Sequence, residues 1–316
     1  NSLGLFYSSA TRLLGLKPLS DESQVMAAAA YGEPKWFDFI RSKVLHHDYK
    51  GHYDLLVNLE RGLGYGALDW DIAASVQKTL EHVLVNLAGW LQNETGMRNL
   101  AYAGGVALNC IANTEIARFA GFDDIAIQPA AGDAGCALGA AALLERPLWE
   151  NAYLGVNASN GMIAEQYAEK ILNGEVVSVI NGRAEFGPRA LGNRSLLCTP
   201  TDDNIEKLNK FKGRIDDSWR PYAPICQEEE ASEWFNIYKT SYEMLFVADI
   251  IGGNFRTHDN TARLQSVSAT KSPLIWKILE MTRQQGYPIL INTSLNAKGK
   301  PIVNTLDDLS EIQLHN

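Results

Sequence analysis

The sequence predicts an α/β protein of two domains, and three observations support that prediction. The chain has 316 residues, which suits about two domains of ~100–200 residues better than a single core. Its hydrophobic share of 46% and charged share of 21% are ordinary for a globular protein. Short apolar runs alternate with segments of helical spacing, and glycines stand at the ends of the runs, which is typical of α/β layers.

The first half is expected to be rich in helix. Between 71 and 96, apolar side chains such as Val76, Leu80 and Leu84 recur at helical spacing. The further predicted elements, in chain order, are a strand over 99–103, a helix over about 107–119, a strand over 124–127, the loop 128–132 and an alanine-rich helix over about 133–144.

The stretch 147–162 is expected to separate two domains, because it contains Gly, Asn and Pro and has weak periodicity. A second α/β unit is predicted after it. Its elements are helices over 164–171, about 203–211 and 272–285, and strands over 176–180 and near 245–250, 262–267 and 288–292.

Charge and cysteine content narrow the class of protein. The net charge of −9 argues against a broad basic surface for nucleic acid. No apolar run reaches the ~18 residues that cross a membrane. The cysteines form no CxxC pair, which argues against a zinc ribbon or a disulfide framework and favours small core residues in a reducing cytoplasm. They stand at positions 110, 136, 198 and 226.

Two turns follow the first two predicted strands. In Ala103–Asn109, paired glycines let the backbone approach a ligand, and free N–H groups at the helix start favour an anion. In Ala131–Ala141, Asp133 is either a helix cap or a ligand of a metal or a metal-bound phosphate. Alone, each motif also fits a plain turn and close helix packing. Both stand at strand ends, where ligands of α/β sheets gather.

The segment Glu185–Arg194 is the best candidate for an anion-binding loop. It follows a predicted strand closely. Arg189 and Arg194 can each form two parallel hydrogen bonds with a phosphate or carboxylate. Gly187 and Gly192 let the loop fold closely around a small anion.

A last set of motifs spans Thr261–Gln265, Ile291–Asn296 and Gly299–Val303. The predicted strand 288–292 leads directly into the Asn-Thr-Ser-Leu-Asn sequence at its tip. The amides and hydroxyls of this tip can orient a nucleotide or a carbamoyl amide. The alternative is a turn that is rich in Asn and Ser.

Taken together, the motifs resemble one family, the O-carbamoyltransferases of nodulation-factor and antibiotic biosynthesis (the NodU/CmcH type). The resemblance covers nearly the whole chain, with the motifs in the expected order. It rests on Ser2–Ser8, Lys17–Gly32, Gly104–Asn109, Gly132–Ala141, Glu185–Ser195, Trp219–Pro224, Thr261–Val267 and Ile291–Asn296.

The resemblance implies a fold and an activity. Residues 1–150 are similar to the C-terminal part of an ASKHA ATPase-fold domain like that of the tRNA-threonylcarbamoyl transferase TsaD, and 163–316 to a YrdC-like domain. Such enzymes activate carbamoyl phosphate with ATP to carbamoyl adenylate. They transfer the carbamoyl group to a hydroxyl of a sugar or natural product. ATP with Mg²⁺, carbamoyl phosphate and a hydroxyl-bearing acceptor are the implied partners, and a homodimer is a further expectation.

The family's motif positions imply site residues. Lys212, Arg220 and Arg263 match the basic residues that would hold carbamoyl phosphate and the ATP phosphates. The segment from Lys212 to Arg220 is longer than usual for the family, which leaves open whether Lys212 or Arg214 is the key cation. The positions implied for substrate or nucleotide binding are Arg189, Arg194, Asn292, Thr293, Ser294, Asn296, Gly104, Gly105 and Asn109.

Asp133 matches the family's aspartate ligand of a divalent metal such as iron or zinc. The family's N-terminal pair of metal-binding histidines has no counterpart, because His46 and His47 are adjacent. The chain starts at Asn1 rather than Met, and it is expected to be a fragment without its N-terminal part and inactive in transfer by itself.

Three alternative functions are open. The net charge and the domain order argue against tRNA threonylcarbamoylation, which steeply salt-dependent RNA binding would support. A sugar kinase of the ATPase superfamily has no use for the Glu185–Ser195 motif. The third alternative, a non-catalytic nucleotide-binding module, belongs to a different class of protein. Calorimetry with carbamoyl phosphate distinguishes a pocket that still binds the substrate from one that has lost binding.

Overall fold

The structure divides into two compact units, Asn1–Ile127 and Gln128–Asn316. This division precedes the stretch 147–162 in which the sequence places a boundary, and the extents of the two family domains stay a prediction. The computed structural model describes residues 2–44, 69–146, 149–214 and 216–313, so His46 and His47 lie outside it. Within these ranges, no helix combines the length and the apolar character that crossing a membrane requires.

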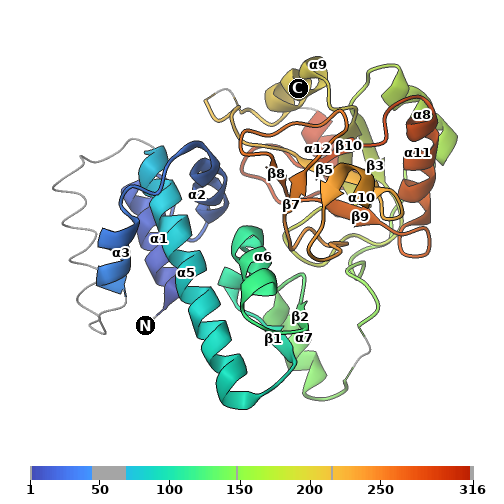
Figure 1. Ribbon diagram of the computed structural model, residues 1–316. Coiled ribbons are helices and arrows are strands. Elements are labelled where there is room, and N and C mark those ends of the chain that lie inside the picture. The colour runs from blue at the N-terminus through green and yellow to red at the C-terminus, as the bar shows by residue number, and fades with distance from the viewer. Residues whose placement is uncertain (1, 45–68, 147–148, 215, 314–316) are drawn as a thin grey trace. The chain divides into compact units, whose positions relative to one another are not determined.

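The first unit is organised around the 26-residue helix α5 (Trp70–Thr95), drawn in cyan in Figure 1. Asp69 caps its start by accepting the N–H of Ile72 at 3.0 Å, and Gly96 ends it in the left-handed conformation at φ 63°. The predicted apolar stripe is buried, as Val76 and Leu80 show. The predicted helix is therefore confirmed almost to the residue.

Shorter elements pack around α5. They are α1 (Leu3–Leu13), α2 (Glu22–Ala28), the 3-10 turn η1 (Ala29–Tyr31), α3 (Phe37–Val44) and α6 (Cys110–Phe119). A two-stranded parallel sheet joins β1 (Asn99–Tyr102) to β2 (Asp124–Ile127), with Leu100 opposite Ile125. The turn η2 (Gly105–Leu108) leads from β1 into α6, so the predicted order of strand, helix and strand is confirmed.

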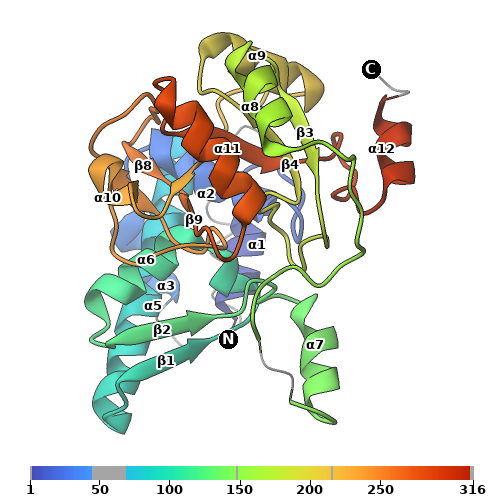
Figure 2. The same cartoon turned by 90° about the vertical axis from the view of Figure 1, so that its right-hand side faces the viewer.

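The second unit is built on a five-stranded sheet in the order β3-β4-β10-β5-β9. Its pairs are antiparallel except β5 with β9, which run parallel. The helices α8 and α11 lie side by side on the sheet (Figure 2). The bounds are β3 Val177–Ile180, β4 Arg194–Cys198, β5 Ala223–Gln227, β9 Gln265–Val267, β10 Leu290–Ser294, α8 Ala164–Leu172 and α11 Pro273–Gln284.

Both faces of this sheet are buried. Along β4, Leu197 faces the core under α8 and α11, while Leu196 and Cys198 face a second core, as the alternation of a strand requires. The remaining elements are α7 (Gly135–Ala142), α9 (Asp202–Phe211), α10 (Ala231–Trp234), α12 (Leu306–Gln313) and an antiparallel sheet of β6 (Phe235–Asn236), β7 (Ala248–Ile250) and β8 (Thr261–Ala262).

The predicted mixed α/β class is confirmed, and the ASKHA and YrdC-like assignments stay predictions. Some elements differ from those expected. The strand predicted over 262–267 is two strands in two different sheets, because the chain turns at Arg263 and Leu264. Three cysteines are buried as expected, whereas Cys136 is exposed on α7.

Candidate functional site

The loop Glu185–Arg194 folds around one carboxylate. Oε1 of Glu185 accepts the N–H groups of Leu191 at 2.7 Å, Asn193 at 2.8 Å and Arg194 at 3.2 Å. Burial raises the pKa of Glu185, and these three backbone donors oppose the rise. The glutamate that opens the motif therefore fixes the shape of the loop.

The side chain of Arg194 is occupied inside the protein. Its exposed fraction is 0%, and its guanidinium donates only to backbone carbonyls within 3.3 Å. These carbonyls belong to Asn304, Asn181, Asn193, Val156 and Gly182. The geometry favours a structural role for Arg194 over the predicted contact with a phosphate, because five donors already have acceptors.

Two amides fasten the loop to the sheet. Nδ2 of Asn292 donates to the carbonyl of Ala190 at 3.2 Å and to Oε1 of Gln265 at 2.6 Å. Gln265 in turn donates to the carbonyl of Leu191 at 2.8 Å. Asn292 is 1% exposed, so in this structure it supports the loop from below instead of facing solvent.

Gly192 is required where the loop meets helix α11. Its φ is +115°, a conformation that side chains rarely adopt, and a Cβ there would lie 2.6 Å from Cγ1 of Ile275. The loop is thus held by the carboxylate of Glu185, by the side-chain amides of Asn292 and Gln265, and by the close packing of Gly192 against Ile275. Arg189 belongs to it and is partly buried, and its part in ligand binding stays a prediction.

Lys212 joins two of the predicted residues. Its ammonium contacts the carbonyl and the hydroxyl of Ser294, and it donates to Asn296 at Oδ1 (2.6 Å) and at the carbonyl (3.0 Å). The hydroxyl of Ser294 also donates to Oδ1 of Asn296 at 2.6 Å. The tip of β10 and the end of α9 therefore meet at one lysine. These oxygens occupy the donors of Lys212, and whether Lys212 or Arg214 takes the family's cationic place stays a prediction.

Two arginines lie in the electrostatic field of Lys212. Burial lowers the pKa of Lys212 to about 7, with repulsion by Arg214 and Arg220 as the further causes. Burial also lowers the pKa of Arg214, and repulsion by Arg220 adds to it. We call Lys212, Arg214 and Arg220 the cationic cluster. The repulsion lowers the pKa of Lys212 and of Arg214, and a cluster of three neighbouring basic side chains suits an anion.

The cluster is held by neighbours that the sequence did not single out. Asp217 accepts from Nη1 of Arg220 at 3.1 Å. The guanidinium of Arg214 stacks on Tyr222, with 4.7 Å from Cζ to the ring centre, and Tyr222 donates to Asn209 at 2.8 Å. Nη1 of Arg214 is buried, and no described residue accepts a hydrogen bond from it. A donor of this kind fits a site for a phosphate oxygen.

Sulfate binding to the cationic cluster is expected to weaken as pH rises from about 6.5 to about 8.5. Free Lys212 loses its proton near its lowered pKa of about 7, whereas a bound anion favours the protonated form. Affinity is therefore highest below that pKa and falls by up to about tenfold per pH unit above it. Calorimetry with sulfate, which does not titrate in this range, measures the slope. Lys212→Met should bind more weakly and without the slope; a slope that survives in this variant contradicts the assignment.

In the first unit, the predicted glycine turn is open. A Cβ on Gly104 or Gly105 would meet nothing within 4 Å, and Gly104 has φ +105°. Asn109 caps α6 by accepting the N–H of Ala112 at 3.0 Å, and it exchanges two side-chain hydrogen bonds with Gln77. The amide of Asn109 thus has structural partners, and ligand binding at Gly104 and Gly105 stays a prediction.

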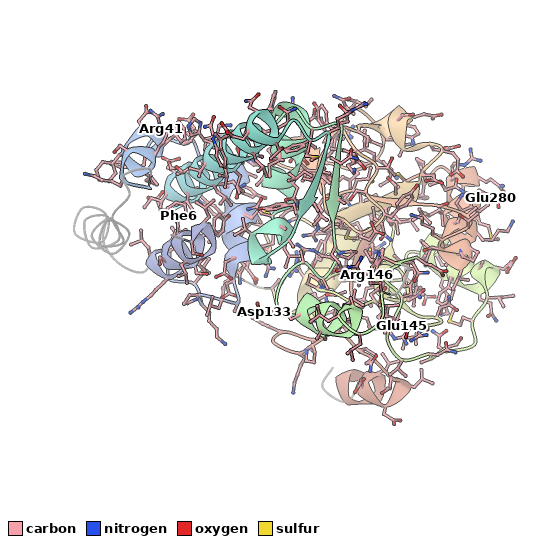
Figure 3. All side chains as sticks on the ribbon, turned by 90° about the horizontal axis from the view of Figure 1, so that it is seen from below. Phe6, Arg41, Asp133, Glu145, Arg146 and Glu280 are labelled. Carbon is pink, nitrogen blue, oxygen red and sulfur yellow. The ribbon has the colours of Figure 1, made fainter. Side chains whose placement is uncertain are left out.

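Asp133 does not cap the helix that follows it. The N-cap position of α7 is Ala134, and the side chain of Asp133 is exposed beside it (Figure 3). Among the described residues, no three His, Cys, Asp or Glu side chains come together as a metal site would require. The donor set around Asp133 therefore does not fit a metal by itself, and its role as a ligand stays a prediction.

Thr293 and Arg263 complete the predicted set. Thr293 lies on β10 opposite Leu196 of β4, between Asn292 and Ser294. Arg263 is partly buried in the turn between β8 and β9. The structure thus brings Lys212, Ser294 and Asn296 into contact, and it places Thr293 next to them in sequence. The ligand contacts of Thr293 and Arg263 stay predictions.

Comparison with known proteins identifies the family. The model of the carbamoyltransferase N-terminus matches residues 1–142, and that of the carbamoyltransferase C-terminus matches residues 168–316. The nodulation protein NolO of Bradyrhizobium diazoefficiens is 35% identical over 98% of this chain and 65% of its own length. The 3'-hydroxymethylcephem-O-carbamoyltransferase of Streptomyces clavuligerus is 32% identical over 66% of this chain and 44% of its own. Nodulation protein U of Sinorhizobium fredii is 32% identical over 73% of this chain and 46% of its own.

The chain spans about half to two thirds of the length of these relatives. The two family models nevertheless cover both of its halves in the family's order, and the match with NolO extends over 98% of the chain. The predicted resemblance is confirmed: the chain belongs to the carbamoyltransferase family.

Proposed function

We propose that this chain activates carbamoyl phosphate with ATP and serves the transfer of the carbamoyl group to a hydroxyl of a sugar or natural product. The observation that carries the proposal is the cationic cluster at the tip of β10, where Lys212 contacts Ser294 and Asn296. The similar proteins include an O-carbamoyltransferase that acts on a hydroxymethyl group by its name.

The first half-reaction makes a mixed anhydride. Carbamoyl phosphate gives up its phosphate to water, and an oxygen of the resulting carbamate forms a bond to the α-phosphorus of ATP. The bond from that phosphorus to the pyrophosphate oxygen breaks. The products are carbamoyl adenylate, pyrophosphate and phosphate. In the second half-reaction, the acceptor hydroxyl attacks the carbamoyl carbon, loses its proton and releases AMP.

The residues of the cationic cluster supply what this chemistry needs. Negative charge gathers on the leaving phosphate and pyrophosphate, and fixed cations stabilise it more strongly in a partly buried site than in water. Arg214 and Arg220 present planar forks that suit phosphate oxygens, while Lys212 supplies a more compact charge. The side chains of Ser294 and Asn296 hold the ammonium of Lys212 in place.

Mg²⁺ would accompany ATP, and iron or zinc at Asp133 belongs to the proposal only through the family resemblance. The described residues around Asp133 do not make a metal site, so no step is assigned to a metal there. The cytoplasmic location and the homodimer are likewise proposals.

Carbamoyl-phosphate-dependent release of pyrophosphate from ATP tests the proposed activation. We expect release only when both substrates are present, together with one phosphate for each pyrophosphate. Arg263→Ala should lower the rate about 10²-fold, if Arg263 stabilises charge as the family position implies. A coupled assay for pyrophosphate measures it. No release by the parent protein, with no effect of Arg263→Ala on binding of carbamoyl phosphate, would sink the proposal.

A further inference from the structure

A network of buried polar side chains ends at the glycine turn of the first unit (residues 104–109). It joins Tyr7 of α1 to Gln77 and Glu81 of α5 and to Asn109, the N-cap residue of α6. Each of the four residues is at most 9% exposed. Buried polar side chains are costly unless they are hydrogen-bonded, and here the hydrogen bonds converge on the amide of Gln77.

The amides of Gln77 and Asn109 form a reciprocal pair. Nδ2 of Asn109 donates to Oε1 of Gln77 at 2.9 Å, and Nε2 of Gln77 donates to Oδ1 of Asn109 at 3.2 Å. The same Oδ1 accepts the N–H of Ala112 at the start of α6. Gln77 therefore holds the residue at which the turn η2 ends and the helix α6 begins.

Two further side chains fix the orientation of the Gln77 amide. The hydroxyl of Tyr7 donates to its Oε1 at 2.8 Å, and Oε1 of Glu81 accepts from its Nε2 at 3.0 Å. Glu81 also pairs with Lys78 at 3.3 Å, which favours the ionised carboxylate, and an ionised carboxylate can only accept. A flipped amide would point its oxygen at this carboxylate. Gln77 thus offers Asn109 one donor and one acceptor in a fixed arrangement.

The glycine turn has a second support, and its glycines are exposed. Nδ2 of Asn113, a residue 0% exposed, donates to the carbonyl of Ala107 at 2.8 Å. A Cβ on Gly104 or Gly105 would meet no atom within 4 Å, and both residues are exposed. Buried amides therefore hold the end of the turn that leads into α6, and its glycine end faces solvent.

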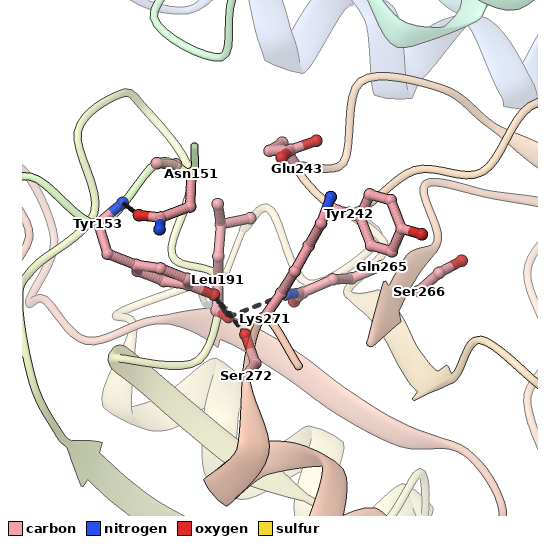
Figure 4. Close-up of a pocket in the computed structure, with 10 residues that line it drawn as sticks. Asn151, Tyr153, Leu191, Tyr242, Glu243, Gln265, Ser266, Lys271 and Ser272 are labelled. Carbon is pink, nitrogen blue, oxygen red and sulfur yellow. Dashed lines mark hydrogen bonds between the residues drawn. The ribbon is translucent and has the colours of Figure 1, made fainter. Parts of the chain in front are cut away.

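The loop Glu185–Arg194 of the second unit is supported in a comparable way. Nε2 of Gln265 donates to the carbonyl of Leu191 at 2.8 Å (Figure 4). The cavity beside these groups holds only about 20 Å³, which is room for about one water molecule and too little for a substrate. The buried amide of Gln265 thus serves the shape of a loop, and Gln77 has the same relation to the glycine turn.

We propose that Gln77 is a positioning residue for nucleotide binding, because its amide, oriented by Tyr7 and Glu81, holds Asn109 and with it the glycine turn in one shape. A backbone that already has its bound shape loses less conformational freedom when a ligand binds, so affinity depends on this support. The inference rests on the proposed function, since the family resemblance implies a nucleotide at this turn. Gln77 does not have to touch the nucleotide, so its effect belongs to affinity and not to the chemical step.

Gln77→Met tests the positioning role in the full chain, because methionine keeps the length of the side chain and removes the amide. We expect KM for ATP in carbamoyl-phosphate-dependent release of pyrophosphate to rise about tenfold, while kcat stays within about threefold. A purely structural role would instead reduce the share of folded protein, which lowers the apparent kcat and leaves KM unchanged. Tyr7→Phe, a milder change that keeps the amide pair, should raise KM about threefold.

Two matched variants in the second unit serve as controls. Gln227 is 4% exposed, and its Nε2 donates to the carbonyl of Trp276 at 3.3 Å, so Gln227→Met removes another buried amide. Tyr167 is 0% exposed and donates to Oδ1 of Asn160 at 2.5 Å, so Tyr167→Phe matches Tyr7→Phe. Sites without shared partners act independently, and KM for ATP should stay within about twofold of the parent in both controls.

Calorimetry with AMP separates this inference from the proposed function. If the parent protein releases no pyrophosphate, the proposed function fails, and an affinity for AMP that is about tenfold weaker in Gln77→Met still upholds the positioning role. The positioning role is overturned if the parent does not bind AMP, or if Gln227→Met shifts affinity as much as Gln77→Met does. Release of pyrophosphate with an unchanged KM for ATP in Gln77→Met would reject the positioning role alone, and without release an unchanged affinity for AMP would do the same.

Discussion

Lys212→Met is expected to lower carbamoyl-phosphate-dependent release of pyrophosphate by about 10²–10³-fold, the cost of removing one donor that stabilises developing charge. The lysine is buried, and its ammonium is the group that joins the end of α9 to Ser294 and Asn296. Methionine keeps the length and the packing of the side chain but offers neither charge nor donors. Initial rates at saturating ATP, with circular dichroism to verify folding, measure the effect.

Lys207→Met is the matched control. Lys207 is on the same helix but is exposed, and its ammonium pairs with Asp203 at 2.5 Å on the helix surface. Exposed pairs of this kind contribute little to stability, so the rate should stay within about twofold of the parent. If both variants lost the same share of the rate of pyrophosphate release, the loss would not be specific to Lys212. Lys212 would then have no place in the proposed site.

Arg194→Met is expected to destabilise the second unit by about 3–5 kcal/mol, because it leaves buried acceptors without a donor. The guanidinium donates to five carbonyls, those of Asn181, Asn193, Val156, Gly182 and Asn304, and so ties three distant segments to its own. Such a network is lost as a whole when its central donor disappears. Urea unfolding followed by tryptophan fluorescence measures the change in the free energy of unfolding.

Arg183→Met provides the comparison for that experiment. Arg183 also donates to carbonyls, those of Leu154 and Gly155, but its side chain is exposed. Water can replace its hydrogen bonds, so a cost below about 1 kcal/mol is expected. If Arg194→Met left stability unchanged and instead weakened sulfate binding, the predicted contact with an anion would be right and the structural role wrong.

Helices with clear caps and stripes could be predicted from the sequence. The α5 helix has an aspartate before its first turn, leucines at helical spacing and a glycine after its last turn. Each of these signals depends only on residues that are close together in the sequence, so it can be recognised without knowledge of the tertiary structure. The strand predicted over 124–127 matches β2 for the same reason.

Two strands of the five-stranded sheet, β4 and β5, were not predicted, and they lack such signals. All five residues of β4 are buried, and it begins with Arg194, so no alternation of apolar and polar residues marks it. The β5 strand contains Pro224 and ends at Gln227, and both are poor indicators of a strand. Their existence depends on β10, which lies between them in the sheet and is distant in the sequence.

The candidate site shows a similar limit. The sequence could gather Lys212, Ser294 and Asn296 into one family site, and the structure brings them into contact. The sequence could not assign different roles to Arg194 and Arg189. An arginine that donates to backbone carbonyls and one that binds an anion have the same sequence signature. The partners that decide this lie as far away as Asn304.

The mutual repulsion within the cationic cluster has a consequence for how the empty protein tolerates heat. Three cations crowd a partly buried space with one acidic partner, Asp217, against Arg220. The folded state without a ligand therefore carries an electrostatic cost that a polyanion relieves, and binding to the folded state alone stabilises it. Phosphate-rich surroundings would thus raise the temperature at which the second unit unfolds, by an amount that depends on the anion concentration.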